Sequence, residues 1–256
     1  MNNIAKPVIE TRRLDLNYDD YHVLHNLSFS INKGDIFIVM GGSGCGKSTL
    51  LKAFIGLLEP VKGEILYDGD NFWDADELQQ HKIMRRFGVL YQGGALWSSL
   101  TLGENVALPL QLYSKLSAAE TREMVELKLA LVGLKGYADF YPSEISGGMR
   151  KRAGLARAIA LDPDIIFFDE PSAGLDPISA KMLDDLILQL RDTFDATIVV
   201  VTHELASILA VGNNSVFLDG ESKTMIATGN PNDLLADSKD PRVIQFLTRG
   251  KKQGAG

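Results

Sequence analysis

Cysteine and long apolar runs are scarce in this sequence. Among 256 residues there is one cysteine, Cys45, which excludes an internal disulfide framework and suits a reducing compartment. No stretch approaches the roughly 18 consecutive apolar residues of a membrane-spanning helix, and residues 1–7 lack the apolar segment of a signal peptide. We therefore expect a cytoplasmic protein that reaches any membrane only through a partner.

An excess of positive charge is also missing. The 26 lysines and arginines are outnumbered by 33 aspartates and glutamates, so no overall positive field draws the protein to DNA or RNA. We accordingly expect no nucleic-acid partner. There is no repeat or low-complexity tract, and 256 residues suffice for one large domain, or for one domain with an inserted lobe.

The sequence does contain a phosphate-loop pattern. Residues 41–49 read GGSGCGKST and satisfy G-x-x-x-x-G-K-S/T. An apolar run at 35–40 precedes them and apolar residues at helical spacing follow at 50–58, so the glycines lie at a strand-to-helix turn. Converging backbone N–H groups and the helix dipole favour an anion there. A glycine-rich turn without a ligand is the alternative, which this context disfavours.

The loop residues are therefore assigned to nucleotide binding. Lys47 would place its charge on the β- and γ-phosphates, and the Ser48 hydroxyl would bind Mg²⁺. Backbone N–H groups around Cys45 would lower its thiol pKa, although a small residue filling a small space is the simpler explanation of this cysteine. Alkylation of the thiol is expected to block ATP binding by bulk. The assigned residues are Gly41, Gly42, Ser43, Gly44, Cys45, Gly46, Lys47, Ser48 and Thr49.

Antiparallel strands are predicted around this loop in the N-terminal part. Residues 8–16 and 23–31 read as strands, and the second alternates as a strand buried on one face does. A shorter strand at 63–67 precedes a tight turn at Asp68-Gly69. Tyr18 ends the first strand. Taken alone, it is interpreted as a half-buried strand aromatic in preference to a ring that stacks on a base.

From residue 93 to about 143 the pattern changes to helices. Ser117 and Glu120 have the spacing of a capping box, which predicts a helix that begins after Ser117. This segment is interpreted as a helical lobe inserted into an α/β core.

The remaining chain alternates apolar strands with a helix. Strands are predicted at 87–91, 164–170 and 197–202, and a helix at 177–194, which together indicate a parallel sheet covered on both faces. Ligands of such sheets bind at the carboxyl ends of the strands. The residues that follow strand ends, and that we expect at one edge, are Gly41, Gln92, Asp169 and His203.

Two adjacent carboxylates at one of these strand ends suit phosphate chemistry. Successive strand residues point to opposite faces, so Asp169 can reach a hydrated Mg²⁺ while Glu170 orients the attacking water. His203 can contact the γ-phosphate or hold the water. A core histidine is the alternative, and the position of His203 after a strand favours the functional interpretation.

A second anion site is predicted at Ser146, Gly147 and Gly148, within the stretch 144–152, which reads EISGGMRKR. Ser146 is a good N-cap, and Gly147 and Gly148 leave backbone N–H groups open at the start of a helix. The first anion site already serves the chain's own nucleotide. This suggests a dimer in which the second site faces the γ-phosphate held by another subunit.

In order and approximate spacing, these motifs resemble the ATPase subunits of ABC transporters over residues 8–235. The resemblance implies an α/β P-loop NTPase (RecA-like) core with an N-terminal antiparallel β subdomain and an inserted helical subdomain. It implies a nucleotide-binding domain at 8–249, with core segments 8–92 and 162–235, a helical subdomain at about 93–161, and a C-terminal tail at 236–256. Two subunits would enclose two ATP molecules head to tail.

The resemblance also implies a role for each motif residue. Tyr18 is then the ring that stacks on adenine, and this replaces its interpretation as a half-buried strand aromatic. Glu170 is the general base, His203 the switch residue and Lys47 a further catalytic residue, while Asp176 makes a contact across the dimer. Mg²⁺ is assigned to Ser48, Gln92 and Asp169, and the nucleotide of the second subunit to Ser146, Gly147 and Gly148.

Shorter matches point to a subgroup. Met149 replaces the usual glutamine, and residues 91–97 and 240–247 resemble segments of ATPases that serve MCE-protein (Mla-type) phospholipid transporters. This implies a homodimer on the cytoplasmic side of a bacterial inner membrane, bound to permease subunits and through them to an MCE protein. A small regulatory subunit is left open as a further partner. The alternatives are an ABC ATPase for another substrate, a soluble ABC ATPase, and a nucleotide-binding regulator with little hydrolysis.

The permease is expected to dock at residues 92–112. Leu96, Trp97, Leu100 and Leu102 offer apolar surface in this segment. The core of the helical lobe is an equal alternative for these four residues, Trp97 included.

Overall fold

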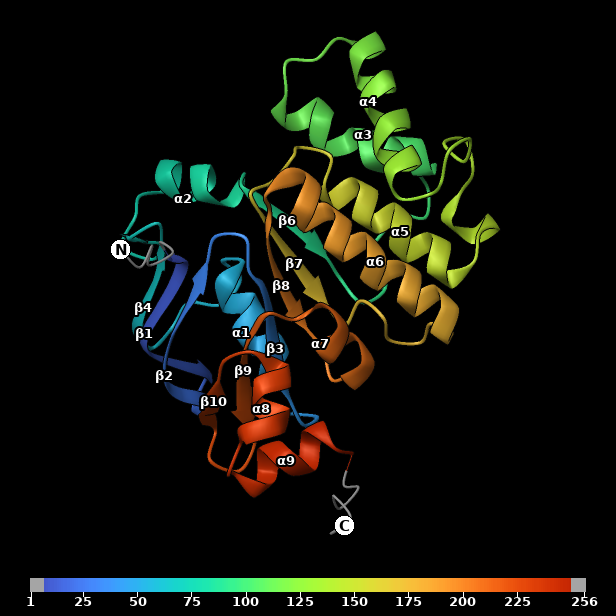
Figure 1. The fold of residues 1–256 in the computed structure, drawn as a ribbon. Coiled ribbons are helices and arrows are strands. Elements are labelled where there is room, and N and C mark those ends of the chain that lie inside the picture. Colours follow the sequence, from blue (N-terminus) through green and yellow to red (C-terminus); the bar gives the residue numbers. More distant parts are fainter. Residues whose placement is uncertain (1–6, 250–256) are drawn as a thin grey trace, which may run out of the picture. The chain divides into compact units, whose positions relative to one another are not determined.

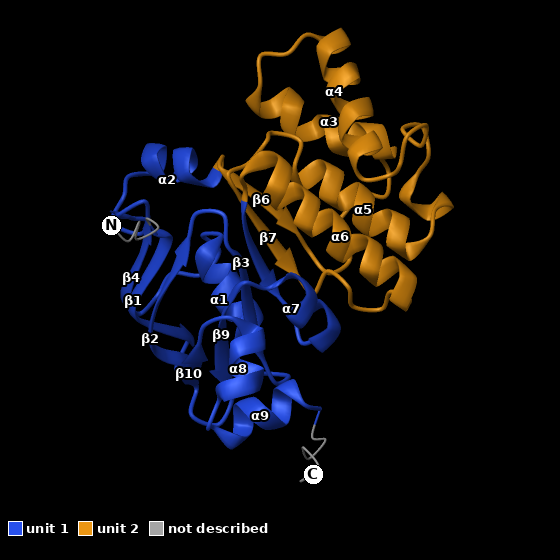
Figure 2. Ribbon diagram, viewed as in Figure 1, with its two compact units in different colours: residues 1–84, 197–256 blue, residues 85–196 orange. Residues whose placement is uncertain are grey.

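The computed structural model describes residues 7–249 (Figure 1). The chain forms two compact units, which Figure 2 distinguishes by colour. Unit 1 contains residues 1–84 and 197–256, and unit 2 contains residues 85–196. Within residues 7–249, no helix is long and apolar enough to cross a membrane.

Unit 1 contains the antiparallel sheet that the sequence predicts. Its strands are β1 (Pro7–Tyr18), β2 (Tyr21–Asn32), β4 (Lys62–Tyr67) and β5 (Asp70–Asn71), in the order β2-β1-β4-β5. One face of β1 and β2 is apolar and buried, and the other face is polar. The turn between β4 and β5 has positive φ at Asp68 (52°) and Gly69 (101°), as a type I′ hairpin requires.

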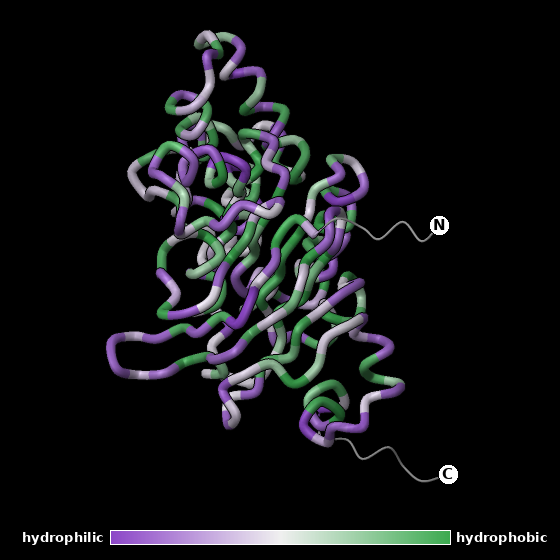
Figure 3. The backbone as a smooth tube through the Cα atoms, turned by 90° about the vertical axis from the view of Figure 1, so that its left-hand side faces the viewer, coloured by the Kyte–Doolittle hydropathy of each residue, from purple (hydrophilic) through white to green (hydrophobic). Residues whose placement is uncertain are grey.

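The parallel strands of unit 1 carry the phosphate loop. They are β3 (Ile36–Gly41), β8 (Thr197–Val201) and β9 (Asn214–Asp219), with β10 (Thr224–Thr228) antiparallel at the edge, in the order β10-β9-β3-β8. Every residue of β3 and β8 is buried, which explains their continuous apolar sequences. Helix α1 (Lys47–Phe54) follows the loop. Hydrophobic segments lie mainly inside and hydrophilic ones mainly in outer loops (Figure 3).

Short helices complete unit 1. They are α2 (Glu77–Met84), α7 (Leu205–Val211), α8 (Pro231–Asp237) and α9 (Pro241–Leu247). Residues 236–249, expected as a tail, thus contain the end of α8 and all of α9, with Val243 and Leu247 buried. Phe246 lies edge-on to Phe217 of β9, with ring centroids 5.1 Å apart. The rest of the expected tail, residues 250–256, lies outside the described residues.

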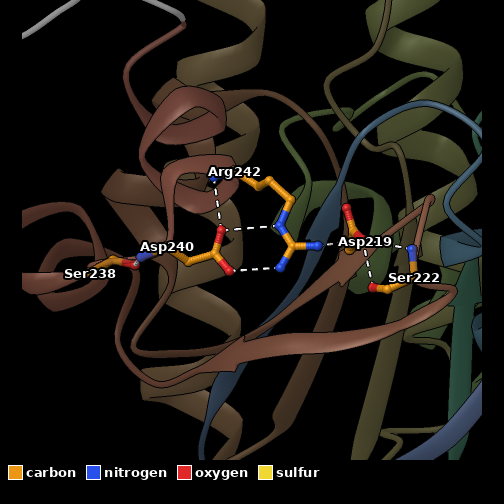
Figure 4. Close-up of polar contacts among 5 residues, drawn as sticks. All are labelled: Asp219, Ser222, Ser238, Asp240 and Arg242. Atoms are coloured by element: carbon orange, nitrogen blue, oxygen red, sulfur yellow. Dashed lines mark hydrogen bonds and ion pairs between the residues drawn. The ribbon is translucent and has the colours of Figure 1, made fainter.

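An ion-pair network anchors α9 to the end of β9 (Figure 4). Arg242 Nη1 lies 2.9 Å from Asp219 Oδ2, and Arg242 Nη2 lies 2.8 Å from Asp240 Oδ2. The Ser222 hydroxyl donates to Asp219 Oδ2 at 2.6 Å. Hydrogen bonds from Ser222, with the charge of Arg242 in support, hold the pKa of Asp219 below its usual range. Because β9 pairs with β3, this anchor lies beside the strand that leads into the phosphate loop.

Unit 2 combines two parallel strands with helices. The strands are β6 (Phe87–Leu90) and β7 (Ile165–Asp169), and the helices are α3 (Leu102–Tyr113), α4 (Ala118–Leu131), α5 (Gly147–Ala158), α6 (Pro177–Phe194) and the 3₁₀ turn η1 (Pro142–Glu144). The capping box of Ser117 and Glu120 is confirmed at the start of α4. A second box, Thr101 with Glu104, begins α3 and was not predicted.

Candidate active site

The phosphate loop in unit 1 joins β3 to α1 through a backbone that only glycine allows. Gly41 has φ of 149°, and a Cβ there would lie 2.3 Å from the carbonyl oxygen of Leu218. The N-cap of α1 is Gly46, with φ of 101°, and no side chain caps the helix. The first turn of α1 also has no acidic residue, so its N–H groups and dipole remain available to an anion.

Lys47 points back into this loop. Its Nζ donates to the carbonyls of Gly41 and Gly42, at 3.0 Å each, and the side chain is buried. The ammonium therefore lies at the centre of the cradle formed by the loop backbone. Ser48, the next residue, is exposed. This part of the site is positively charged and has a hydroxyl at its rim.

Cys45 corrects one sequence expectation. The residue is 2% exposed. Burial raises the pKa of its thiol and outweighs the opposite effects of Lys47 and the neighbouring backbone N–H groups, so the expected lowering is wrong. The cysteine packs against Gly220, at which a Cβ would lie 3.5 Å from Cys45 Cα. The simpler explanation, a small residue in a small space, fits this environment.

Tyr18 and His203 lie at the surface of unit 1. Tyr18 is 41% exposed, its hydroxyl accepts a hydrogen bond from Lys52 Nζ at 3.1 Å, and that Nζ lies 5.4 Å from the ring centroid. The side chain of Tyr18 is therefore more exposed than that of an aromatic residue buried in the core of a sheet. His203 is exposed just after β8, with Nε2 3.8 Å from Glu204 Oε1. Because β8 runs parallel to β3, unit 1 places His203 and the phosphate loop at the same sheet edge, as expected.

Unit 2 brings the other strand-end residues together. Strands β6 and β7 are parallel, with Leu90 opposite Phe168, so Gln92 and Glu170 leave their strands at the same edge. Strand β7 ends at Asp169, and Glu170 has φ of 47°. The sequence predicts that these two side chains alternate along one strand. The strand instead ends at Asp169, and Glu170 begins a turn with a left-handed backbone. Such a conformation costs about 1–3 kcal/mol and is common at functional sites.

A buried lysine of α5 holds this turn. Lys151 Nζ donates to the carbonyls of Ala173 (2.6 Å) and Pro171 (2.7 Å) and, more weakly, of Glu170 (3.5 Å). Burial lowers the pKa of Lys151, and the charge of Glu170 opposes that shift. This contact was not predicted from the sequence. The available signal was the position of Lys151 four residues before the buried Leu155, which places it on the inner face of the helix.

The two ends of α5 contact other candidate segments. Ser146 is the N-cap and accepts from Met149 N at 3.2 Å, and no acidic residue lies in the first turn, so the predicted anion site is available. Near the other end, Arg157 donates to Gly94 O (3.2 Å) and Ala95 O (2.8 Å). Helix α5 thereby fixes the loop that follows Gln92.

Asp176 has a local role in its own subunit. It is the N-cap of α6, and its carboxylate accepts from Ile178 N and Ser179 N at 3.0 Å each and from the Ser179 hydroxyl at 2.6 Å. These hydrogen bonds, first that of the Ser179 hydroxyl, lower the pKa of Asp176. The carboxylate is held at the start of α6 in its charged form.

A glycine-rich loop between a buried strand and an uncapped helix, with two carboxylates after another parallel strand, defines a P-loop nucleotide hydrolase of the α/β class. The chain belongs to the ABC transporter family, whose sequence profile matches residues 24–173. It is thus an ATP-binding, ATP-hydrolysing cassette, as the sequence resemblance implied.

Known proteins resemble the chain over most of its length. It is 40% identical to the intermembrane phospholipid transport system ATP-binding protein MlaF of Haemophilus influenzae, over 96% of this chain and 92% of that protein. It is 41% identical to the probable ribonucleotide transport ATP-binding protein mkl of Mycobacterium tuberculosis, over 96% of this chain and 67% of that protein. The dimeric post-hydrolysis structure of the ATP-binding cassette MJ0796 with ADP and Pi matches at TM-score 0.79 and 29% identity, covering 87% of this chain and 98% of that one.

Proposed function

We propose that this chain is the ATP-hydrolysing subunit of an MCE-associated phospholipid transporter, in which ATP closes a homodimer and a membrane permease moves the lipid. The observation that carries this proposal is the 40% identity to MlaF over nearly the whole of both chains. The dimeric MJ0796 cassette supports the homodimer. Residues 91–97 and 240–247, which resemble segments of such ATPases, agree with it.

The ATP-binding roles are assigned from the family resemblance, and each residue's surroundings support them. Residues 41–49 hold the phosphates through backbone N–H groups, and the buried ammonium of Lys47 is already directed into the loop. The exposed ring of Tyr18 is available to stack on adenine, with the positive charge of Lys52 beside it. In the other subunit, Ser146, Gly147 and Gly148 present open N–H groups to the γ-phosphate.

The residues assigned to Mg²⁺ have suitable donors. Ser48, Gln92 and Asp169 supply hydroxyl, amide and carboxylate oxygens, the ligand type that Mg²⁺ prefers. Bound Mg²⁺ neutralises charge on the phosphate oxygens. Mg²⁺ usually keeps several waters and takes few protein ligands, so these three residues suffice as its protein contacts.

Hydrolysis is assigned to Glu170 and His203. Glu170 accepts a proton from the attacking water as general base, and His203 contacts the γ-phosphate as the switch residue. Asp176 contributes to the contact between subunits from its fixed position at the start of α6. Hydrolysis then reopens the dimer, and the change is passed to the permease.

The segment 92–112 presents a surface for the permease. Trp97 is 60% exposed, whereas Leu102 is fully buried, so the alternative of a core residue holds for Leu102 and not for Trp97. Buried Asn105 fixes this loop. Its Nδ2 donates to the carbonyls of Trp97, Leu100 and Thr101, and its Oδ1 accepts from Trp97 N at 2.8 Å. The indole is therefore held outward by a rigid scaffold.

The proposal includes the organisation and location given by the resemblance. Residues 8–249 form the nucleotide-binding domain, with core segments 8–92 and 162–235, a helical subdomain at about 93–161 and a C-terminal segment from 236. The subunit lies peripherally on the cytoplasmic face of a bacterial inner membrane. An MCE protein, reached through the permease, and a small regulatory subunit complete the proposed complex.

Purification of the tagged full chain from membranes tests the proposal. We expect a permease and an MCE protein to copurify, and phospholipid-containing nanodiscs to support ATPase activity. Glu170→Gln should lower turnover by about 10²–10⁴-fold. The similarity to mkl makes ribonucleotide transport the second candidate. Stimulation by ribonucleotides with no response to phospholipid would favour it, and copurification with ribosomes or DNA in place of a permease would refute both.

A further inference from the structure

Lys151 is a buried charge to which the ATP chemistry above gives no role. It is 7% exposed, although it lies between two other basic residues, Arg150 and Arg152. An ammonium has three N–H donors and no acceptor. Lys151 directs its ammonium at three carbonyls of one short turn, those of Glu170, Pro171 and Ala173. Burial of this charge costs free energy unless such partners compensate it.

Two backbone hydrogen bonds lie within the turn. Ala173 N donates to Glu170 O at 3.2 Å and Leu175 N to Ser172 O at 3.0 Å. Glu170 has a left-handed backbone, and the buried Ser172 hydroxyl has no hydrogen-bond partner among the described residues. Both features disfavour this conformation. The contacts of the Lys151 ammonium with three carbonyls of the turn oppose this cost and hold the backbone in place.

The position of the turn gives this contact a consequence. Glu170 is its first residue, so the direction of the carboxylate depends on the backbone that Lys151 holds. Lys151 also lies on α5, which begins at Ser146, Gly147 and Gly148. One side chain thus joins the helix that begins at the second anion site to the turn that starts with the carboxylate.

We propose that Lys151 is a positioning residue for Glu170, and that it fixes the carboxylate by holding the carbonyls of residues 170–173 to helix α5. This inference rests on the proposed role of Glu170 as general base. Lys151 does not contact the reacting atoms. It acts on the rate of hydrolysis and leaves ATP affinity nearly unchanged.

Matched variants of the full chain, purified with the membrane proteins that accompany it, test this inference. Lys151→Met removes the donors and keeps a long side chain, and Lys151→Arg restores charge and donors. The control is Arg152→Met. Arg152 is the next residue on α5, and its Nη1 donates to Val132 O at 3.1 Å and Gly133 O at 3.4 Å, far in sequence from the turn. The readouts are kcat, the Kd for ATP and the circular-dichroism spectrum.

We expect Lys151→Met to lower kcat by about 10²-fold, since a small misplacement of a catalytic group has an effect of that order, with the Kd for ATP unchanged. Lys151→Arg should recover most of the rate, and Arg152→Met should behave like the unmodified chain. A wild-type kcat for Lys151→Met, or equal losses for Lys151→Met and Arg152→Met, would overturn the inference. If Lys151→Met does not fold, Lys151→Gln replaces it, with a partial loss expected and no loss overturning the inference.

Glu170→Gln separates this inference from the proposed function. If Lys151 acts through Glu170, then Lys151→Met should have much less effect on the residual single-turnover rate in the Glu170→Gln background. The same fold-loss in both backgrounds refutes the positioning role and leaves Glu170 as the base. Full turnover by Glu170→Gln alone refutes the base assignment itself.

Discussion

Replacement of Gly154 by alanine tests how tightly α5 holds the loop after Gln92. Gly154 lies inside α5, where helix propensity alone makes alanine more stable by about 1 kcal/mol. A Cβ at this position, however, would lie 2.7 Å from Gly94 O and 2.9 Å from Gly94 Cα. Both are backbone atoms, so relief requires the helix or the loop to move. Overpacking of this kind costs about 1–3 kcal/mol, so the net effect is a loss of about 1 kcal/mol.

Thermal unfolding followed by circular dichroism measures this effect. A loss of about 1 kcal/mol lowers Tm by about 2–4 °C for a chain of this size. Gly147→Ala is the control, because a Cβ there meets only the Arg150 side chain, at 3.8 Å. Its Tm should be unchanged or higher. A higher Tm for Gly154→Ala would refute the close approach of α5 to Gly94.

Three further predictions concern single side chains. Asp176→Ala removes the N-cap of α6 and should lower the free energy of unfolding by about 1 kcal/mol in denaturant titrations. Asp176→Asn, which keeps a good cap, should cost little, and equal losses for the two variants would contradict the capping role. Cys45, the only cysteine, should react with a disulfide reagent at least about tenfold more slowly in the folded chain than in urea. The pH at which its reaction rate is half-maximal should lie above the ordinary thiol pKa, and fast reaction at neutral pH would contradict its burial. Folding lowers the pKa of Asp219, so its contribution to stability is present above the unfolded pKa of about 3.9 and is lost as pH falls through the folded value. The difference in Tm between the unmodified chain and Asp219→Asn should therefore be larger at pH 7 than at pH 2, and a constant difference would count against the Ser222 and Arg242 contacts.

The phosphate loop was predictable because its determinants are local. Glycines, a lysine and the flanking apolar runs lie within about 25 residues, and each acts on its own backbone. The strand ends were predictable for the same reason, since a continuous apolar run such as 197–202 indicates a buried parallel strand wherever it occurs. The structure confirms these elements within one or two residues.

The contacts around Glu170 were not predictable in this way. The acceptors of Lys151 are backbone carbonyls about 20 residues away, and a carbonyl has no sequence signature. The left-handed φ of Glu170 follows from where β7 ends and not from the residue type. The thiol pKa of Cys45 was misjudged because burial is a tertiary property. Helices α8 and α9 did have local signals, since both follow Asn or Asp at the N-cap with Pro at the first helical position.

The pairing of β3 has a consequence for synthesis of the protein on the ribosome. Its parallel partners, β8 and β9, lie about 160 residues or more further along the chain. Because translation proceeds at about 5–20 residues per second, the partner strands are synthesised roughly 10–30 s after β3, and its apolar side chains stay unpaired during that time. The antiparallel sheet β2-β1-β4-β5 is complete once Asn71 has emerged. Nascent chains stalled before residue 197 should therefore bind chaperones through β3, and the nucleotide cradle is among the last parts to acquire its native shape.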